Sequence, residues 1–206
     1  MRDINICVFG ASITWGSYDT EKGGWADRLK LFFFVQENDK FAQVYNLGIS
    51  GDTTNDLLKR IDVECEARRP GTIIFSIGNN DSSFVKSLDG NRTPIEEFRE
   101  NLEKLCEKAR KFTEEIMFIG LTGVDESKTQ PIYWNTDISY SNENIGKYDV
   151  EIEKFCQEKK LKYINLRGIL EPGDWEDGLH PNAKGHEKIF EILKPEVLSI
   201  FQEVKD

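Results

Sequence analysis

Both histidines of this chain, His180 and His186, lie in one turn-rich segment, DWEDGLHPNAKGH (174–186). Asp177 precedes His180 by three residues, so a helical or tight-turn conformation would let its carboxylate reach Nδ1 of the imidazole. A histidine oriented in this way can act as a general base that removes the proton of a nucleophile. The Nε2 atom of His180 would then be available to a serine elsewhere in the chain.

Ser12 is the candidate nucleophile. It follows the apolar run 4–10 in the stretch GASITWG, where a helix is expected to begin. Serine is also a favoured N-cap residue, so this position alone does not distinguish a nucleophile from a cap. The backbone N–H groups of Ser12 and of Gly51, in NLGISGDTTND, could bind the oxyanion of a tetrahedral intermediate together with the side-chain amide of Asn80, in SIGNND. Each of these segments could also be an ordinary strand-to-helix turn.

The other titratable residues around His180 have simpler interpretations. His186 falls in the first turns of the last expected helix, and we expect a structural role for it because nothing near it supplies a nucleophile. Asp174 and Glu176 are expected to be solvated loop charges. No second histidine or cysteine stands at ligand spacing from His180, so the sequence predicts no metal site.

The elements that must position these groups are strands and helices in alternation. Continuous apolar runs predict strands at 4–10, 42–48, 72–78, 116–121 and 161–166. Uninterrupted apolar runs of this kind are typical of parallel strands that are covered on both faces. Functional groups collect at the carboxyl ends of such strands, which is where Ser12, Gly51 and Asn80 stand.

Helical periodicities lie between the expected strands, and the clearest spans 93–112. For this helix we expect Thr93 as N-cap, Pro94 as first helical residue and Glu96 as capping-box partner. The alternation predicts an α/β fold with a parallel sheet and helices on both of its faces. The segment 121–141 does not fit the alternation; it is expected to be a long loop, either a lid or specificity segment or a solvated insertion.

Four segments, taken together and in order, resemble the blocks of the SGNH/GDSL hydrolase family. FGASITWG is similar to the first block with Ser12, NLGISGDTT to the second with Gly51, IGNND to the third with Asn80, and DGLHPN to the last with Asp177 and His180. The resemblance extends from residue 6 to about 190. It implies a flavodoxin-like three-layer α/β/α sandwich with a five-stranded parallel sheet, one domain over 1–206, and ester hydrolysis without a metal or an organic cofactor.

One departure from the family pattern concerns the first block. The usual Gly-Asp-Ser is replaced here by Gly10-Ala11-Ser12. Because Asp177 matches the orienting acid, we expect the Ala11 difference to alter local hydrogen bonding more than the chemistry. The G-x-S-x-G pattern of α/β-hydrolases is absent, since Thr14 stands where its second glycine would be.

The function that this resemblance implies is a serine-dependent acylhydrolase, acting through an acyl-enzyme on a small ester or an O-acylated substrate such as an acetylated sugar. Two alternatives stay open: an acyltransferase with the same acyl-enzyme, and a non-catalytic carbohydrate- or acyl-binding protein. Trp15, Trp134 and Trp175 are candidates for the substrate pocket, although ordinary packing is an equally good explanation for each.

The composition of the chain indicates which partners and which environment to expect. The formal net charge of −10 disfavours nucleic acid as a partner, and no apolar run approaches the length of a membrane span. The four cysteines are scattered through apolar segments, which predicts buried reduced thiols. The chain as it stands opens on a strand without a signal sequence, so we expect a cytoplasmic protein. Phe32, Phe33 and Phe34 cover more than one helical face, and one of them is expected at a homodimer contact.

Overall fold

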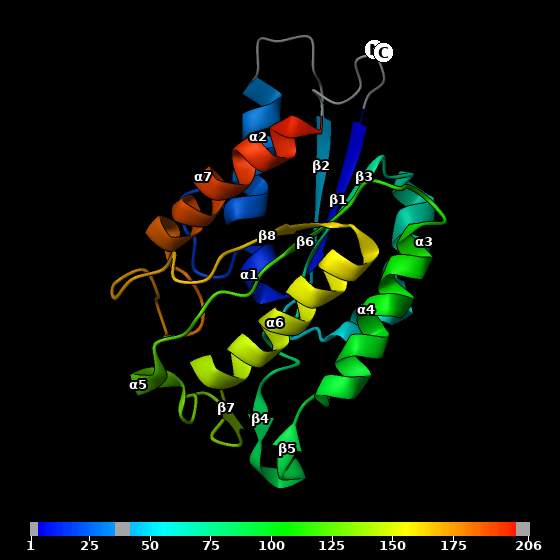
Figure 1. The fold of residues 1–206 in the computed structure, drawn as a ribbon. Coiled ribbons are helices and arrows are strands. Elements are labelled where there is room, and N and C mark those ends of the chain that lie inside the picture. The colour runs from blue at the N-terminus through cyan, green and yellow to red at the C-terminus, as the bar shows by residue number, and fades with distance from the viewer. Residues whose placement is uncertain (1–3, 36–41, 201–206) are drawn as a thin grey trace.

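A five-stranded parallel sheet forms the centre of the protein (Figure 1), of which the computed structural model describes residues 4–35 and 42–200. Its order is β2-β1-β3-β6-β8, the flavodoxin-like order in which the first strand of the chain lies between the second and the third. The predicted strands are confirmed, although β3, β6 and β8 end two residues earlier than expected. The strands are β1 (Ile4–Gly10), β2 (Ala42–Gly48), β3 (Thr72–Ser76), β6 (Ile116–Ile119) and β8 (Lys162–Ile164).

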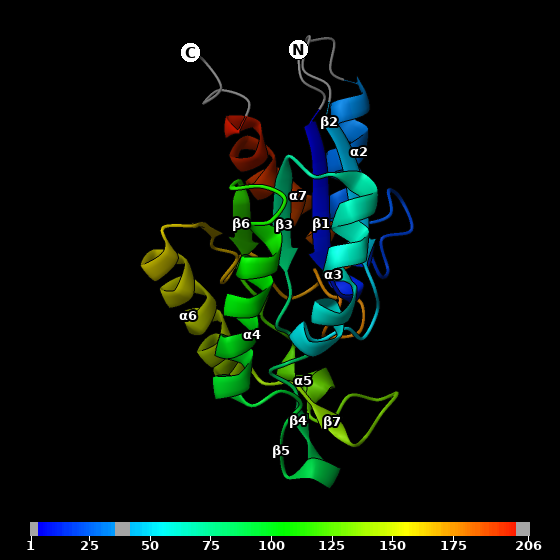
Figure 2. The ribbon, with the colours of Figure 1, turned by 90° about the vertical axis from the view of Figure 1, so that its right-hand side faces the viewer.

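Helices cover both faces of this sheet, as Figure 2 shows. Alternate residues of each strand point to opposite faces, so Cys7 and Phe9 pack into one core while Ile6 and Val8 pack into the other. The predicted three-layer architecture is therefore confirmed. The first face is covered by α3 (Thr54–Arg68), α4 (Ile95–Ala109) and α6 (Asn142–Lys159), and the second by α2 (Trp25–Val35) and α7 (Ala183–Ser199).

The start of α4 differs from the expectation. Pro94, not Thr93, is the N-cap, and no side chain caps the helix, so the predicted capping box is wrong. Thr93 is buried in the preceding loop, where its N–H donates to the carbonyl of Asp81. A capping box is present instead at α3, where the side chains of Thr53 and Asp56 accept from each other's backbone N–H groups.

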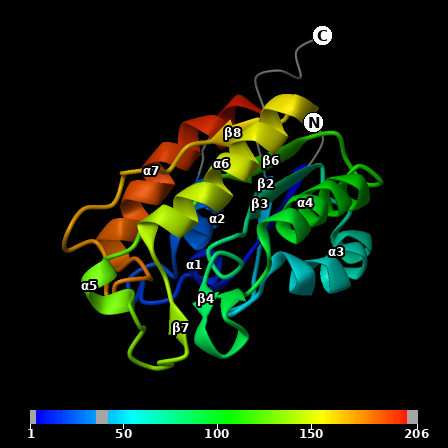
Figure 3. The same cartoon turned by 60° about the horizontal axis from the view of Figure 1, so that its bottom comes forward.

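A second, small antiparallel sheet, with the order β5-β4-β7, lies beyond the carboxyl ends of the parallel strands (Figures 1 and 3). Segment 121–141 contributes β7 to this sheet and also contains α5, and its role as a lid or specificity segment stays a prediction. The expected long loop therefore carries short elements that the sequence did not reveal. The physical reason is that β7 is only two residues long and pairs with a strand far away in the sequence. The added elements are β4 (Phe84–Val85), η1 (Lys86–Leu88), β5 (Gly90–Asn91), α5 (Glu126–Thr129) and β7 (Ile138–Ser139).

The remaining expectations from composition are met in part. The four cysteines are buried and unpaired. Phe33 is buried and Phe34 is 59% exposed, while Phe32 packs partly against the core on the α2 and α7 side. No helix within residues 4–35 and 42–200 has the length and apolar character that crossing a membrane requires. The homodimer and the cytoplasmic location stay predictions.

Candidate active site

Ser12, His180 and Asp177 form a continuous chain of hydrogen bonds. Ser12 is the first residue of α1 (Ser12–Trp15), directly beyond the carboxyl end of β1. Its Oγ lies 2.8 Å from Nε2 of His180, and Nδ1 of His180 lies 2.7 Å from Oδ2 of Asp177. The fold thus joins a serine and a histidine that are 168 residues apart in the sequence.

The turn between Asp177 and His180 uses both carboxylate oxygens. Oδ1 accepts the backbone N–H groups of Leu179 at 2.9 Å and of His180 at 2.7 Å, while Oδ2 faces the imidazole. Burial pushes the pKa of the Asp177 carboxyl upward, but these hydrogen bonds outweigh it and the net pKa is lowered. At neutral pH the carboxylate therefore keeps the proton of His180 on Nδ1 and leaves Nε2 as an acceptor for the serine.

Gly178 anchors this turn against segment 121–141. Its φ of +96° lies in the left-handed region, and its carbonyl accepts the N–H of Asp125 at 2.8 Å. A side chain at this position would also approach Cβ of Lys128 to 2.7 Å. Glycine is required here both by the backbone conformation and by the close contact with α5.

Asn80 is held in one orientation beside Ser12. Its Nδ2 donates to the carbonyl of Asp52 at 2.9 Å, and its Oδ1 accepts the hydroxyl of Tyr140 at 2.9 Å. An amide nitrogen carries two protons, so one remains to be donated into the pocket that Ser12, Gly51, Asn80 and His180 line together. Tyr140 was not predicted from the sequence, where the only signal was the presence of aromatic residues in 121–141.

The backbone of the second block supplies another donor. Gly51 has a φ of +87°, a conformation that other residues rarely adopt. No acceptor among the described residues takes the N–H of Gly51 or of Ser12. These two groups and the free proton of the Asn80 amide are the donors that an oxyanion bound beside Ser12 could use.

Asn79 and Asp81, the polar neighbours of Asn80 in the sequence, form hydrogen bonds that connect this loop to other segments. Asn79 donates through Nδ2 to the carbonyl of Thr122 at 3.1 Å. The buried carboxyl of Asp81 accepts the N–H and hydroxyl of Thr54, which ties the loop after β3 to the start of α3. Of the three polar residues in the third block, Asn80 is the one that lines the pocket with Ser12 and His180.

The pocket beside Ser12 has a volume of about 530 Å³ and a largely aromatic wall. Trp15 and Trp134 line it as expected, but Trp175 does not, so this prediction is wrong. Nε1 of Trp175 donates to the carbonyl of Gly123 at 3.1 Å, and its ring packs against the core on the α2 and α7 side. The position of Trp175 near His180 in the sequence does not show whether its ring faces the pocket or the core.

Two aromatic rings pack against the imidazole of His180. The ring of Tyr18 lies 5.5 Å from it and that of Trp134 5.7 Å, the latter nearly parallel at 28°. The rings leave His180 9% exposed, which limits its access to water. The lining residues that the sequence analysis did not predict are Ser17, Tyr18, Ser50, Arg92, Tyr133, Ile138, Tyr140 and Leu179.

Ala11, which stands where the family pattern has Asp, lies beside a second and much smaller cavity. This cavity of about 20 Å³ is also lined by Ser12, Asn79 and Thr122. It is large enough for about one water molecule. The contacts between Ser12, His180 and Asp177 are formed with Ala11 at this position.

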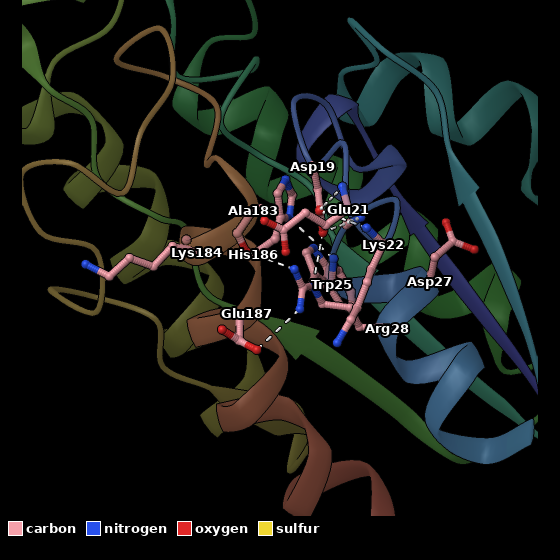
Figure 4. A network of polar contacts seen from close by, with 12 residues as sticks. Asp19, Glu21, Lys22, Trp25, Asp27, Arg28, Ala183, Lys184, His186 and Glu187 are labelled. Atoms are coloured by element: carbon pink, nitrogen blue, oxygen red, sulfur yellow. Dashed lines mark hydrogen bonds and ion pairs between the residues drawn. The ribbon is translucent and has the colours of Figure 1, made fainter. Parts of the chain in front are cut away.

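A buried polar network joins the loop after α1 to the start of α7 (Figure 4). The carboxylate of Asp19 accepts Nε of Arg28 at 2.9 Å, and Arg28 also donates to the carbonyl of Ala183 at 3.0 Å. His186 lies in the same network: Nδ1 accepts the N–H of Trp25 at 3.3 Å and Nε2 donates to the carbonyl of Ser17 at 3.0 Å. Burial lowers the pKa of His186, so its ring is neutral at pH 7, in keeping with the expected structural role.

We expect Asp19→Asn to lower the free energy of unfolding by about 3 kcal/mol, because it leaves the buried charge of Arg28 with only the exposed carboxylate of Glu187, 3.5 Å away, as a counter-ion. Burial raises the pKa of Asp19, but hydrogen bonds from Arg28 and three backbone N–H groups outweigh it and lower the net pKa below 3.8. The carboxylate therefore stabilises the fold above pH 4, and its contribution is lost as the pH falls through the lowered pKa. Urea unfolding at pH 7 and at pH 3 measures both effects.

The control for this experiment is Glu100→Gln, which breaks an exposed ion pair with Lys104 and should leave stability nearly unchanged. An equal loss of stability in Asp19→Asn at both pH values would contradict the role given to the Asp19 carboxylate.

Asp174 is a further correction. Its carboxylate was expected to be a solvated loop charge, yet the residue is fully buried and bonds Lys188 at 2.7 Å and the N–H of Glu171 at 2.7 Å. Glu176 is exposed as expected. In the part of the chain that the structure describes, no group of three or more His, Cys, Asp or Glu side chains is placed to hold a metal ion.

The chain is similar to known proteins over nearly its whole length. It is 28% identical to a GDSL esterase/lipase of Arabidopsis thaliana over 92% of the chain and 62% of that protein, so it spans less than two thirds of this relative. It is 26% identical to the human isoamyl acetate-hydrolyzing esterase 1 homolog, over 92% of the chain and 79% of that protein. A solved lipase/acylhydrolase from Enterococcus faecalis superposes with a TM-score of 0.77 at 26% identity, over 94% of this chain and 95% of the other.

The family match covers the residues of the site. Residues 8–188 match the GDSL-like lipase/acylhydrolase family, and this range includes Ser12, Gly51, Asn80, Asp177 and His180. With most of the chain matched and the fold shared, the chain belongs to the GDSL-like lipase/acylhydrolase family.

Proposed function

We propose that this protein is a serine ester hydrolase that removes short acyl groups from small esters through an acyl-enzyme. The single observation that carries this proposal is the hydrogen-bonded chain from Ser12 Oγ to His180 to Asp177, with distances of 2.8 and 2.7 Å. Membership of the acylhydrolase family supports the same reaction type.

The proposed reaction has two halves. Ser12 Oγ attacks the ester carbonyl while Nε2 of His180 takes its proton, and the negative charge on the carbonyl oxygen is bound by the N–H groups of Ser12 and Gly51 and by the Asn80 amide. The imidazolium passes its proton to the departing alcohol, which leaves Ser12 acylated. His180 then takes a proton from water as the water attacks the acyl group, and the acid is released as Ser12 regains its proton.

The class of substrate is argued from the pocket and from one relative. The pocket of about 530 Å³ is within the range of small-molecule sites. Exposed aromatic rings of Trp15, Tyr133 and Trp134 line it, and such surfaces suit an apolar alcohol or the face of a sugar. A human relative is named for the hydrolysis of isoamyl acetate, an ester of a two-carbon acid. An acetylated alcohol or sugar is therefore the substrate class that we propose.

The experiment that tests this function compares p-nitrophenyl acetate, butyrate and octanoate. The expected result is that kcat/KM is highest for acetate and falls with chain length. Labelling of the protein by a fluorophosphonate without turnover of any ester would favour the acyltransferase, which an added alcohol or sugar acceptor would then reveal. Absence of both labelling and turnover would reject an acyl-enzyme mechanism and leave a binding protein.

A further inference from the structure

The charge of the pocket lining differs from that of the whole chain. The chain has a formal net charge of −10. Yet among the described residues that line the pocket there is no Asp, Glu or Lys, and Arg92 is the one side chain with a fixed charge at neutral pH. A single cation in a pocket whose described lining contains no carboxylate favours an anion that binds directly against it, although the net charge of the chain repels anions.

The Arg92 side chain has no partner within the described part of the protein. No carboxylate pairs with its guanidinium, and no hydrogen bond from it is formed to another described residue. Six other arginines have carboxylates within 4.0 Å, and Arg69, which does not line the pocket, is like Arg92 in having no such partner among the described residues; the six are Arg28, Arg60, Arg68, Arg99, Arg110 and Arg167. Arg92 can therefore offer all of its donors to a ligand.

The backbone that carries Arg92 is firmly held. Its N–H donates to the carbonyl of Ser83 at 2.8 Å. The preceding residue, Asn91, belongs to β5, and its Nδ2 donates to the hydroxyl of Tyr148 at 3.0 Å. The following residue, Thr93, is buried and donates its N–H to Asp81. A side chain on such a rigid support can bind a ligand without the cost of ordering a loop.

Arg92 belongs to the side of the pocket that holds Gly51 and Asn80. Burial is the main cause that raises the pKa of the Asp52 carboxyl, next to Gly51, and it raises the pKa of Tyr140, the partner of Asn80, to about 12. The positive charge of Arg92 is near enough to act against both shifts. Asp52 forms its ion pair with Arg60, whose nitrogen lies 2.8 Å from Oδ2, and it has no ion pair with Arg92 within 4.0 Å.

From this placement we propose that Arg92 is a specificity-determining residue that binds an anionic group, a carboxylate or a phosphate, on the ester substrate. This inference rests on the proposed function, since it concerns the substrate of the same site. The planar guanidinium can form two parallel hydrogen bonds to such a group. The anion could belong to the acyl part or to the alcohol part of the ester, and the two sources are separated by the choice of substrates.

The experiment uses two pairs of esters at low ionic strength. For the alcohol part, 4-acetoxybenzoate is compared with the neutral 4-acetoxybenzamide. For the acyl part, monomethyl succinate is compared with methyl butyrate. Arg92→Gln is expected to lower kcat/KM for the anionic member of one pair by roughly three- to tenfold, while the neutral member is nearly unchanged. Arg92→Lys should restore part of the loss, and added salt should reduce the difference.

The matched control is Arg110→Gln, which removes the same charge from the end of α4, outside the pocket. Equal effects of Arg110→Gln and Arg92→Gln would assign the change to overall charge and overturn the proposal. So would an equal change for the anionic and neutral members of both pairs. If the neutral esters are hydrolysed in a manner that depends on Ser12, these outcomes reject the anion site alone. If no ester is hydrolysed, the proposed function fails as well.

Discussion

Ser12→Ala is expected to lower kcat/KM for p-nitrophenyl acetate by about 10⁴-fold or more, because the alanine leaves no atom that can form the acyl-enzyme. The Ser12 hydroxyl lies at the surface of the pocket and contacts His180 Nε2 at 2.8 Å. Its removal deletes one hydrogen bond and no packing contact of the core. The melting temperature should therefore change little, and thermal unfolding measured on the same preparation checks this.

The control for Ser12→Ala is Ser199→Ala, at the C-terminal end of α7. The hydroxyl of Ser199 bonds the carbonyl of Glu196 and Nζ of Lys162, at a distance from the pocket lining, and the variant should retain full activity. A fluorophosphonate should label the wild type and Ser199→Ala but not Ser12→Ala. Turnover by Ser12→Ala near that of the wild type would reject Ser12 as the nucleophile.

Asp177→Asn is the second change with a large expected effect, a loss of kcat on the order of 10⁴-fold. The amide can still accept a backbone N–H, so the turn to His180 keeps much of its geometry. Its neutral group no longer stabilises the imidazolium, and an amide nitrogen facing Nδ1 would favour the tautomer with its proton on Nε2. His180 would then lack the lone pair that accepts the proton of Ser12.

The pH dependence follows from the Asp177 carboxyl. Burial raises its pKa, but hydrogen bonds from His180 and Leu179 outweigh this and set it below 3.8, so the carboxylate is ionised throughout the neutral range. The loss of kcat in Asp177→Asn should therefore persist throughout pH 6 to 8, where the wild-type carboxylate stays ionised. Glu176→Gln changes an exposed carboxylate in the same loop and should have no such effect. A loss of less than about tenfold in Asp177→Asn would show that the carboxylate is not needed to orient His180.

Part of the fold could be predicted because its signals are local. Each strand of the parallel sheet is buried on both faces, so the run 4–10 is apolar without interruption, and β1 has the predicted bounds. The site residues Ser12, Gly51 and Asn80 were predicted because they follow such strands, whose carboxyl ends meet at one edge of a parallel sheet. The spacing of three between Asp177 and His180 likewise fixed their contact within a single turn.

Three features that the sequence did not reveal depend on contacts outside the local turn. In the sequence Asp174 resembles a solvated loop charge, but in the structure Lys188 of α7 donates a hydrogen bond to its carboxylate. The direction of Trp175 is decided by the carbonyl of Gly123, 52 residues earlier. The pairing of β7 with β4 joins two strands of two residues each, too short to leave a periodic pattern.

The order of the parallel strands along the chain, the family blocks and the proposed nucleophile, base and orienting acid could all be inferred before the structure was known. These follow from residue type and from spacing within a few positions. The surroundings of the site residues became visible only in the folded chain. They include Tyr140 against the Asn80 amide, Trp134 against the His180 ring, and Arg92 without a counter-ion in the pocket. These contacts depend on the direction in which side chains from distant segments point, and that direction is set by packing, which no local pattern contains.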